Sequence, residues 1–464
     1  MAQHQILVFN PSGFYVGDLT TSAVNFRYVR AVNDRGYFEV EATDADWPME
    51  WRDIDYQYHF WRRPNGGDWG LEFVGLCPDR FTDTQGSITT KRVEGFGVND
   101  LLDRRIIAYK AGTAQSKKTD YLDDMCKAIV NDNLGSGASD ARNILTAFNM
   151  SIAPDLSDAP SVTKSFAYEN VLETLQALAD TSAGQASGAV DLFFNIACDG
   201  YRSNERPHFE FRTYTGQPGV DRTDGGGNSA ATVFSLENAN IANVHYQRIH
   251  SGERNYIYAG GLGLESDRNV VEASDAARIA QSPVNRRELF VSATHLADAD
   301  ASEAAYEALN ENRPTRKLSC DLLDTETTPY GLAWNWGDKV TVYYGEGKFD
   351  EIVRAVDVSV QNKKETIRAT FGFGATIGNA VAFGFGATIG NAVAPLMKEI
   401  KKLRRDLKRL QAGGAEYARY VGDGTAVPTT TELPREGQYY LFDNGIVRRV
   451  YYNLGGTIRT ATLT

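Results

Sequence analysis

Cysteine is scarce in this chain, and its spacing excludes two familiar kinds of site. The 464 residues include 4 cysteines, which lie far apart at Cys77, Cys126, Cys198 and Cys320. No pair has the Cys-x-x-Cys spacing of a zinc ribbon or a thioredoxin-like motif. We therefore expect buried thiols in a protein that folds in a reducing compartment. The N-terminus also lacks the basic region and apolar core of a signal peptide.

An excess of basic residues is absent as well. Lysine and arginine total 48, against 60 aspartates and glutamates, so the net charge is −12. Tight binding to phosphates needs clustered lysine and arginine side chains. This balance argues against a protein whose task is to hold nucleic acid firmly.

Common catalytic and cofactor motifs are missing too. Among the 6 histidines there is no His-Glu-x-x-His motif, and the spacing of His245 and His250 suits no zinc site. No Gly-x-Ser-x-Gly stands ahead of a predicted helix. The glycine-rich loops at 345–349 and 372–378 match neither the P-loop nor the dinucleotide-binding fingerprint. We therefore expect no metal, no cofactor and no enzyme activity.

Glycine and aromatic residues, in contrast, are abundant. The chain has 43 glycines, 23 tyrosines and 22 phenylalanines, a composition typical of strands joined by turns. Alternating residues such as those at 54–60 predict half-buried strands in the first hundred residues, as in a barrel or sandwich. Helical spacing predicts helices over 120–130, with Thr119 as N-cap, over 168–180 and over 302–312. The length corresponds to roughly three domains.

A perfect repeat follows the last strand of this body. The sequence FGFGATIGNAVA occupies residues 371–382 and recurs unchanged at 383–394. Solenoids need three or more copies, so this pattern indicates a tandem duplication or a sequence error. The surrounding uncharged segment, 369–397, is long enough to cross a membrane. Its glycines and asparagines favour a strand end and a loop instead, so membrane contact is not expected.

A basic helix is predicted over 396–411, with a heptad seam. Apolar residues recur at spacings of 4, 3, 4 and 3, at Leu396, Ile400, Leu403, Leu407 and Leu410. This spacing predicts an oligomerising coiled-coil seam. A helix of about 24 Å would fray alone, so the seam stabilises only copies that are already held together. The alternative is one amphipathic helix packed on its own body, since periods of 3.5 and 3.6 are hard to separate over so few turns.

Two other features leave different functions open. Paired aspartates could supply the carboxylates of a glycan-degrading enzyme, although a chain with 60 acidic residues contains such pairs by chance. The pairs are Asp44 with Asp46, Asp53 with Asp55, and Asp298 with Asp300. Exposed tryptophans could stack on sugars in a receptor-binding tip, or they could fill the core and rim of the first barrel. These are Trp47, Trp51 and Trp61.

Four passages follow one another in a characteristic order and spacing. They are RVEGFGVNDLLDRRII at 92–107, ENVLETLQALAD at 169–180, GVDRT at 219–223 with VFS at 233–235 and RNYIYAGG at 254–261, and WNWGDKVTV at 334–342. Together they resemble the tail-tip hub proteins of siphophages, a minor tail protein family that is similar to the baseplate hubs of contractile phages. The resemblance covers most of the chain before the repeat. It does not extend to the repeat or to the last fifty or so residues.

The resemblance implies an α+β, β-rich fold with two small β-barrels and inserted α+β domains. To this the sequence adds a coiled-coil-like helix and a small β appendage, whose strands meet at the predicted hairpin turn Asn444-Gly445. The expected parts are a first hub barrel at 1–105, completed by later strands, an α+β domain at 106–215, strands and a helix of the hub body at 216–315, strands of the second barrel at 316–375, the duplicated Gly/Ala-rich loop at 376–394, the oligomerising helix at 395–412 and the C-terminal β appendage at 413–464.

The resemblance also implies a structural role without catalytic residues. Such hubs are trimeric rings at the distal tail tip of the virion, where they join the tail tube to tip or receptor-binding proteins. DNA would be a partner only in transit through the ring. We expect the C-terminal region to hold a tip or fibre protein. A tail-associated glycan-degrading enzyme and a sugar-binding tip module are the alternatives.

Overall fold

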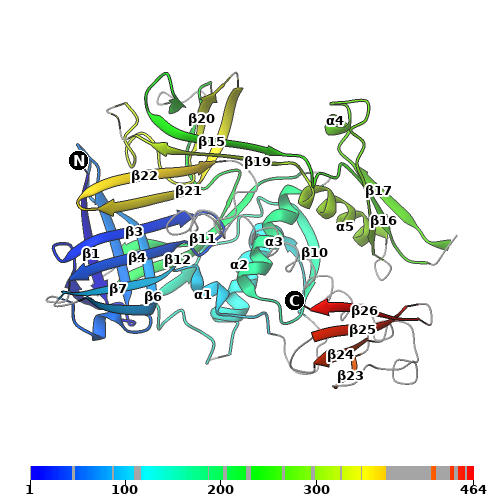
Figure 1. Ribbon diagram of the computed structural model, residues 1–464, viewed down its shortest axis with the longest axis horizontal. Coiled ribbons are helices and arrows are strands. Elements are labelled where there is room, and N and C mark those ends of the chain that lie inside the picture. The colour runs from blue at the N-terminus through cyan, green and yellow to red at the C-terminus, as the bar shows by residue number, and fades with distance from the viewer. Residues whose placement is uncertain are drawn as a thin grey trace. The chain divides into compact units, whose positions relative to one another are not determined.

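Figure 1 shows the computed structural model of the chain. The structure describes residues 2–43, 47–85, 88–108, 116–139, 141–185, 188–201, 206–225, 231–263, 267–293, 298–323, 325, 327–345, 347–371, 420–424, 439–443, 448–454 and 457–463. Contacts divide the chain into two units, Met1–Val381 and Ala382–Thr464. Each unit is described by itself.

The first unit is built on one large sheet that combines strands from both ends of the unit (Figure 1). In spatial order the main path is β15, β19, β22, β21, β3, β4, β7, β6, β5, β1 and β2. The strands are β1 (Gln3–Phe9), β2 (Tyr15–Asp18), β3 (Ala23–Ala31), β4 (Tyr37–Thr43), β5 (Gln57–Arg63), β6 (Gly70–Gln85), β7 (Ile88–Gly97), β15 (Ile241–Ile249), β19 (Thr315–Leu322), β21 (Gly347–Gln361) and β22 (Lys364–Phe371). The early and late strands meet where β3 pairs with β21.

The long strand β21 also carries a side branch of the sheet. Its first residues pair with β20 (Lys339–Tyr344). Strand β20 in turn pairs in parallel with the short strands β13 (Asp221–Arg222) and β14 (Val233–Ser235). The sequence WNWGDKVTV therefore leads into this branch.

Aromatic side chains fill the core of the large sheet. The rings of Tyr28, Phe38, Tyr58 and Trp334 are at most 1% exposed, and Trp47, just before the short 3-10 helix η2 (Glu50–Arg52), joins them. Burying each such ring stabilises the fold by about 1.5–3 kcal/mol. The abundance of Phe and Tyr in the sequence is thus explained by one continuous aromatic core.

Strand β5 differs from the strand predicted at 54–60. It begins at Gln57, and Ile54 before it is 70% exposed. The strand is also buried on both faces rather than one, because Tyr58 and Phe60 point into the core while the rings of Phe9 and Tyr201 pack on His59. His59 is fully buried there, and burial lowers the pKa of His59 to about 3. Its polar residues suggested an exposed face, but they are paired inside the protein.

The segment between β7 and β13 forms an α+β body with its own hydrophobic core. It contains a two-stranded sheet and a three-stranded sheet, of order β10-β8 and β11-β12-β9. Its elements are α1 (Asp100–Asp103), β8 (Ser116–Tyr121), α2 (Leu122–Leu134), β9 (Met150–Ile152), β10 (Ser161–Phe166), α3 (Val171–Ala183), β11 (Leu192–Tyr201) and β12 (Pro207–Thr215).

Both predicted helices of this body exist, but both begin later than predicted. Helix α3 begins after Asn170, whose side chain accepts a hydrogen bond from the backbone N–H of Glu173 and acts as the N-cap. Tyr168 has a φ of 59°, which is not helical. Ahead of α2, Thr119 does not cap the helix. It lies in β8, where its hydroxyl contacts that of Thr163 in β10 at 2.8 Å.

Residues 250–314 form a smaller group, which we call the peripheral module. It consists of β16 (Tyr256–Gly260), β17 (Val270–Ser274), α4 (Ala276–Ile279), β18 (Glu288–Ser292) and α5 (Asp298–Glu311). Helix α5, predicted over 302–312, packs Ala305 and Leu309 against Ile257 of β16. The chain enters the module from β15 and leaves it into β19, and these strands pair with each other (Figure 1).

The second unit contains one described sheet, of order β23-β24-β25-β26. The strands are β23 (Tyr420–Gly424), β24 (Tyr439–Asp443), β25 (Arg448–Leu454) and β26 (Thr457–Leu463). Strands β24 and β25 pair antiparallel on either side of the predicted hairpin turn. The turn residues themselves, at 444–447, lie outside the described residues.

The predicted fold class is confirmed in its coarse form, because the chain is α+β and rich in strands. The described strands of the large sheet follow an open path from β15 to β2. No closed barrel is present among the described residues.

Candidate functional site

The predicted oligomerisation seam lies outside the described residues. All of its apolar positions fall in 372–419, as does most of the duplicated repeat. The seam therefore stays a prediction. The described candidate site lies in the first unit.

The two ends of the large sheet are open strand edges. Strand β2 pairs only with β1, and β15 pairs only with β19, among the described strands. The unpaired N–H and C=O groups of an edge strand can pair with a strand of another chain. The large sheet thus offers two candidate assembly sites.

The two edges differ in chemistry. Along β15 the side chains from His245 to Ile249 are exposed, and Arg248 is among them. Tyr246 packs on the ring of Phe349, with 5.4 Å between the ring centres. Near β2, Phe14 is 51% exposed and Tyr15 55% exposed. The β2 edge ends in the exposed Asp18. The charged residue of each edge strand therefore differs in sign, Arg248 on β15 and Asp18 on β2.

A buried ion pair joins strands from the two ends of the unit. Arg62 of β5, with a side chain that is 0% exposed, donates to both carboxylate oxygens of Glu365 in β22, at 2.7 and 3.2 Å. His4 of β1 lies 3.0 Å from the same carboxylate. Burial alone would raise the pKa of Glu365, but the neighbouring His4 and Arg62 side chains outweigh it and lower that pKa to about 2.

The same arginine also holds the loop before β20. Its Nη1 donates to the backbone oxygen of Tyr330 at 2.7 Å, and the Tyr330 hydroxyl donates to Glu72 of β6. On the neighbouring strands, Arg27 of β3 makes a two-pronged ion pair with Asp357 of β21, at 2.8 and 2.9 Å. These contacts hold β3, β5 and β6 to β21, β22 and the loop before β20.

Two asparagines attach the α+β body to the large sheet. Asn33 accepts from the backbone N–H of Phe194 at 2.8 Å and donates to the oxygen of Leu192 at 3.0 Å. Asn99 accepts from the N–H of Ile196 at 2.7 Å. These side-chain amides bond to the edge of β11 as a neighbouring strand would. They satisfy backbone groups that would otherwise be buried without partners.

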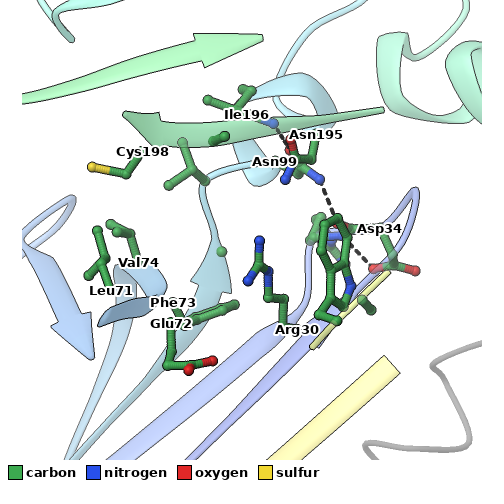
Figure 2. A pocket seen from close by; sticks show the side chains of 16 residues that line it. Arg30, Asp34, Leu71, Glu72, Phe73, Val74, Asn99, Asn195, Ile196 and Cys198 are labelled. Carbon is green, nitrogen blue, oxygen red and sulfur yellow. Dashed lines mark hydrogen bonds between the residues drawn. The ribbon is translucent and has the colours of Figure 1, made fainter. Parts of the chain in front are cut away.

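A small cavity lies beside Asn99 (Figure 2). Its volume is about 110 Å³, and its walls include Arg30, Val74, Cys198 and Trp336. The Arg30 guanidinium lies 4.1 Å from the centre of the Trp336 ring, and the buried Nε1 of Trp336 has no acceptor. A polar space of this size suits a few ordered water molecules. We therefore treat it as part of the junction and not as a ligand site.

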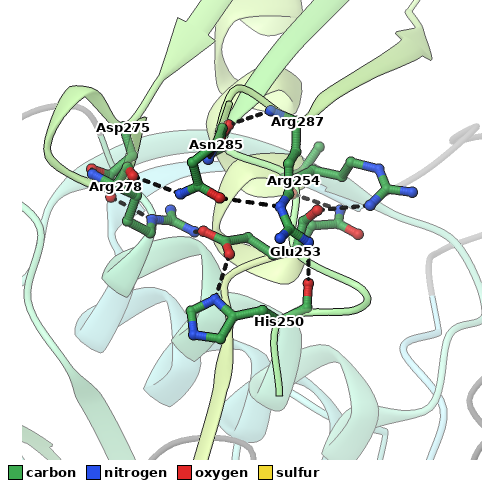
Figure 3. A network of polar contacts seen from close by, with 10 residues as sticks. His250, Glu253, Arg254, Asp275, Arg278, Asn285 and Arg287 are labelled. Atoms are coloured by element: carbon green, nitrogen blue, oxygen red, sulfur yellow. Dashed lines mark hydrogen bonds and ion pairs between the residues drawn. The ribbon is translucent and has the colours of Figure 1, made fainter. Parts of the chain in front are cut away.

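A second polar network ties together the two chain segments at the base of the peripheral module (Figure 3). Glu253, 1% exposed, accepts from His250 at 2.6 Å. Arg287 donates to the backbone oxygen of His250 at 2.7 Å. The backbone N–H of Arg254, on the incoming segment, donates to Asn312 on the outgoing segment at 2.8 Å. The chain segment that enters the module and the segment that leaves it are thus held side by side.

The tryptophans proposed as sugar platforms are not free rings. Trp47 is 1% exposed and lies in the core. The expectation that its ring is exposed and stacks on sugars is therefore wrong. Trp51 packs against the same core, and Trp61 stacks on Tyr201 with 5.8 Å between ring centres. Their hydrophobic surface stabilises the fold of the first hundred residues.

The paired aspartates show no shared catalytic geometry where the structure describes them. Asp53 contacts Arg80 at 2.9 Å, and Asp55 contacts Arg104 at 2.6 Å, so each carboxylate has its own arginine. Asp44 and Asp46 lie outside the described residues, and so do the side chains of the pair in α5.

The cysteines are free thiols, as predicted. Cys77, Cys126 and Cys320 are buried, and Cys198 is half-buried. Burial raises the pKa of Cys77 to about 12 and that of Cys198 to about 11. Within the described residues no group of His, Cys, Asp or Glu side chains could hold a metal ion. No described helix is long and apolar enough to cross a membrane.

No local sequence pattern predicts the residues that hold this junction together. Arg62 and Glu365 are more than 300 positions apart, and a charged pair at that distance leaves no local pattern. Asn33 lies in the Asn-Asp-Arg-Gly turn and has a φ of 55°. An Asn in a turn between two strands, a residue type that tolerates the left-handed conformation, is the local signal for the part that Asn33 plays in this junction.

Comparison with known families now places the chain. The family model described as "Siphovirus ReqiPepy6 Gp37-like protein" matches residues 8–373. The chain belongs to this family of siphovirus tail proteins. The resemblance stated from the sequence passages is thereby confirmed, and the place of this tail protein is the tail of the virion. No curated protein matches it.

Two solved structures with similar folds are tail proteins. A 43 kDa tail protein of prophage MuSo2 from Shewanella oneidensis has a TM-score of 0.50 and 12% identity, covering 79% of this chain and 98% of that one. A tail protein from Neisseria meningitidis has a TM-score of 0.49 and 9% identity, covering 80% and 97%. At such identities the likeness concerns the fold alone. The first of these supports a phage tail protein fold for residues before the repeat.

Proposed function

We propose that this tail protein is a trimeric hub, a ring at the distal tail tip that joins the tail tube to tip or receptor-binding proteins. The observation that carries the proposal is the pair of open edges on the large sheet. Edge β2 carries the acidic Asp18, and edge β15 carries the basic Arg248. Edges that differ in this way favour head-to-tail contact, in which one copy's β2 meets the next copy's β15. Such contacts generate closed rings when the rotation between copies closes.

The C-terminal parts would complete the hub. The predicted seam from Leu396 to Leu410 would bundle around the threefold axis, where copies are already held together by the ring. The β appendage at 413–464 would hold a tip or fibre protein. The two predicted barrels belong to the same proposal, with each half of the large sheet as part of a barrel wall.

The acidic balance supports a passage for DNA rather than a DNA-binding site. A net charge of −12 repels a passing phosphate backbone and keeps it from sticking to the wall. No enzyme activity is proposed. Asp53 and Asp55, which a glycan-degrading enzyme could have used, are each engaged by a separate arginine.

The test is the oligomeric state together with a crosslink across the proposed contact. We expect the full-length protein to have the mass of a trimer in light scattering. A double variant, Tyr15→Cys with Ile249→Cys, should give covalent trimers with a bismaleimide linker. Each single variant should give few crosslinks, because in a head-to-tail ring equivalent residues of different copies do not meet. The exposed pair Met49→Cys with Val284→Cys serves as the control.

Two results would overturn the hub proposal. One is a protein that is only a monomer, or a ring of another symmetry. The other is a double variant that crosslinks no better than the control pair in a protein that does form trimers.

A further inference from the structure

The sheet of the peripheral module has one covered face and one open face. Helix α5 packs on Ile257, Ala259 and Ala273 on the covered side. Side chains alternate along a strand, so the residues between these point the other way. The open face carries Tyr256, Tyr258 and Gly260 of β16, Glu272 of β17, and Glu288 and Phe290 of β18.

Phe290 lies across this face with its ring open to solvent. A Cβ on Gly260 would stand 2.6 Å from Cζ of Phe290 and 3.0 Å from Cδ of Arg268. The ring therefore occupies the space that a side chain at Gly260 would need. It is nevertheless 51% exposed. The Arg268 guanidinium lies 5.9 Å from the centre of this ring, and the part of the ring that stays exposed is a surface on which a flat ligand can stack.

Polar groups stand in fixed positions next to this platform. Tyr258 neighbours Phe290 in the parallel register of β16 and β18. Arg286 donates to the Tyr258 hydroxyl at 2.8 Å and to Glu288 at 2.6 Å. The Tyr256 hydroxyl donates to Glu272. Donors and acceptors are thus already oriented beside the ring, which lowers the entropy cost of binding.

The charges of the described residues on this face cancel. Arg268 and Arg286 are balanced by Glu272 and Glu288. A site for nucleic acid or another polyanion needs a clear excess of positive charge, which this face lacks. Carboxylates beside guanidiniums suit a ligand whose groups both donate and accept hydrogen bonds.

We propose that the open face of the peripheral module binds a neutral glycan. One sugar ring would stack its C–H face on Phe290, because aromatic faces are electron-rich and attract C–H groups. Its hydroxyls would bond to the charged groups of Arg286 and Glu288. This site is independent of the trimer, since every residue in it comes from one copy. It also lies apart from the tryptophans of the first hundred residues.

Titration calorimetry of the full-length protein tests the proposal. The probes are neutral hexasaccharides of glucose, galactose and N-acetylglucosamine, with heparin and an oligothymidylate as polyanions. We expect saturable binding of at least one neutral hexasaccharide and none of the polyanions. Phe290→Ala should weaken that binding at least tenfold. The control is Phe81→Ala, because Phe81 is also an exposed ring on a sheet, 38% exposed, with Arg92 lying 4.6 Å over it.

A second variant keeps the test valid if removal of the ring disturbs the module. Arg286→Gln keeps Phe290 in place and removes one set of hydrogen bonds, so it should weaken the same binding without changing the thermal unfolding midpoint. Three results would overturn the proposal. They are no binding of any neutral hexasaccharide, equal binding by Phe290→Ala and the wild-type protein, and binding of the polyanions alone. A monomeric protein that still binds the glycan would reject the hub and leave this site intact.

Discussion

At the scale of single residues, the buried pair of Arg62 and Glu365 is the most demanding feature of the first unit. A charge removed from water is tolerated only when its partners satisfy it. Arg62 has such partners in Glu365 and in the backbone oxygen of Tyr330. Removal of either charge leaves the other buried and unpaired.

This pair predicts an acid-dependent loss of stability. The pKa of Glu365 is about 2 in the folded protein, against an ordinary value of 4.5. A depressed carboxyl pKa contributes stability that is present above pH 4.5 and is lost as the pH falls toward 2. Glu365→Gln should therefore lower the free energy of unfolding by about 3 kcal/mol at pH 7. The difference from the wild-type protein should shrink steadily below pH 4.5 in urea titrations.

The control for this experiment is Asp53→Asn. Asp53 pairs with Arg80 on the surface, with side chains 60% and 41% exposed. Exposed pairs contribute about 1 kcal/mol or less, so this variant should change the unfolding free energy little. If both variants changed the free energy of unfolding by the same amount, the burial of Glu365 would not contribute to stability.

Asn99 gives a second prediction at this scale. Asn99→Ala removes the acceptor for the N–H of Ile196 and the donor to the oxygen of Asp34. The N–H of Ile196 would stay buried without its acceptor, so we expect a loss of about 1–3 kcal/mol in the free energy of unfolding. Asn99→Asp keeps the acceptor oxygen and should recover part of the loss. Asn269→Ala, at an exposed position, should be neutral. Urea denaturation followed by tryptophan fluorescence measures all three.

At the scale of elements, the close approach of β6 to the ring of Phe38 limits the size of the residue at position 75. Gly75 of β6 faces Phe38, and an added Cβ would stand 2.2 Å from that ring. Gly75→Ala must therefore displace a fully buried side chain, and we expect a loss of about 1–3 kcal/mol. Gly252 has no atom within reach of an added Cβ, so Gly252→Ala is the matched control. Equal thermal midpoints for the two variants would contradict this packing.

Local sequence patterns predicted which elements exist better than where they begin. The apolar spacing of α3 was visible, but its start was decided by the side chain of Asn170 bonding to Glu173. The start of α2 was decided by β8, whose partner β10 lies some forty residues further along the chain. No local pattern reports such a pairing. The aspartate pairs suggested catalytic carboxylates and the tryptophans suggested sugar platforms for a similar reason, because their partners come from distant parts of the chain.

At the scale of the whole molecule, the division into two units predicts what each contributes. The first unit, Met1–Val381, has its own cores. A chain ending at Val381 should therefore keep the urea midpoint of the first unit's unfolding. It also lacks the predicted seam, so its trimer should dissociate at higher protein concentrations than that of the full chain. Analytical ultracentrifugation measures the shift. An unchanged trimer would show that the seam contributes nothing to assembly.

The pairing of Ile249 with Thr315 across the base of the peripheral module has an evolutionary consequence. The module interrupts a hairpin, so its two junctions are neighbours in space and its removal leaves β15 and β19 still in register. A gene segment encoding residues 250–314 can therefore be replaced by a short turn or another domain while β15 and β19 keep their pairing.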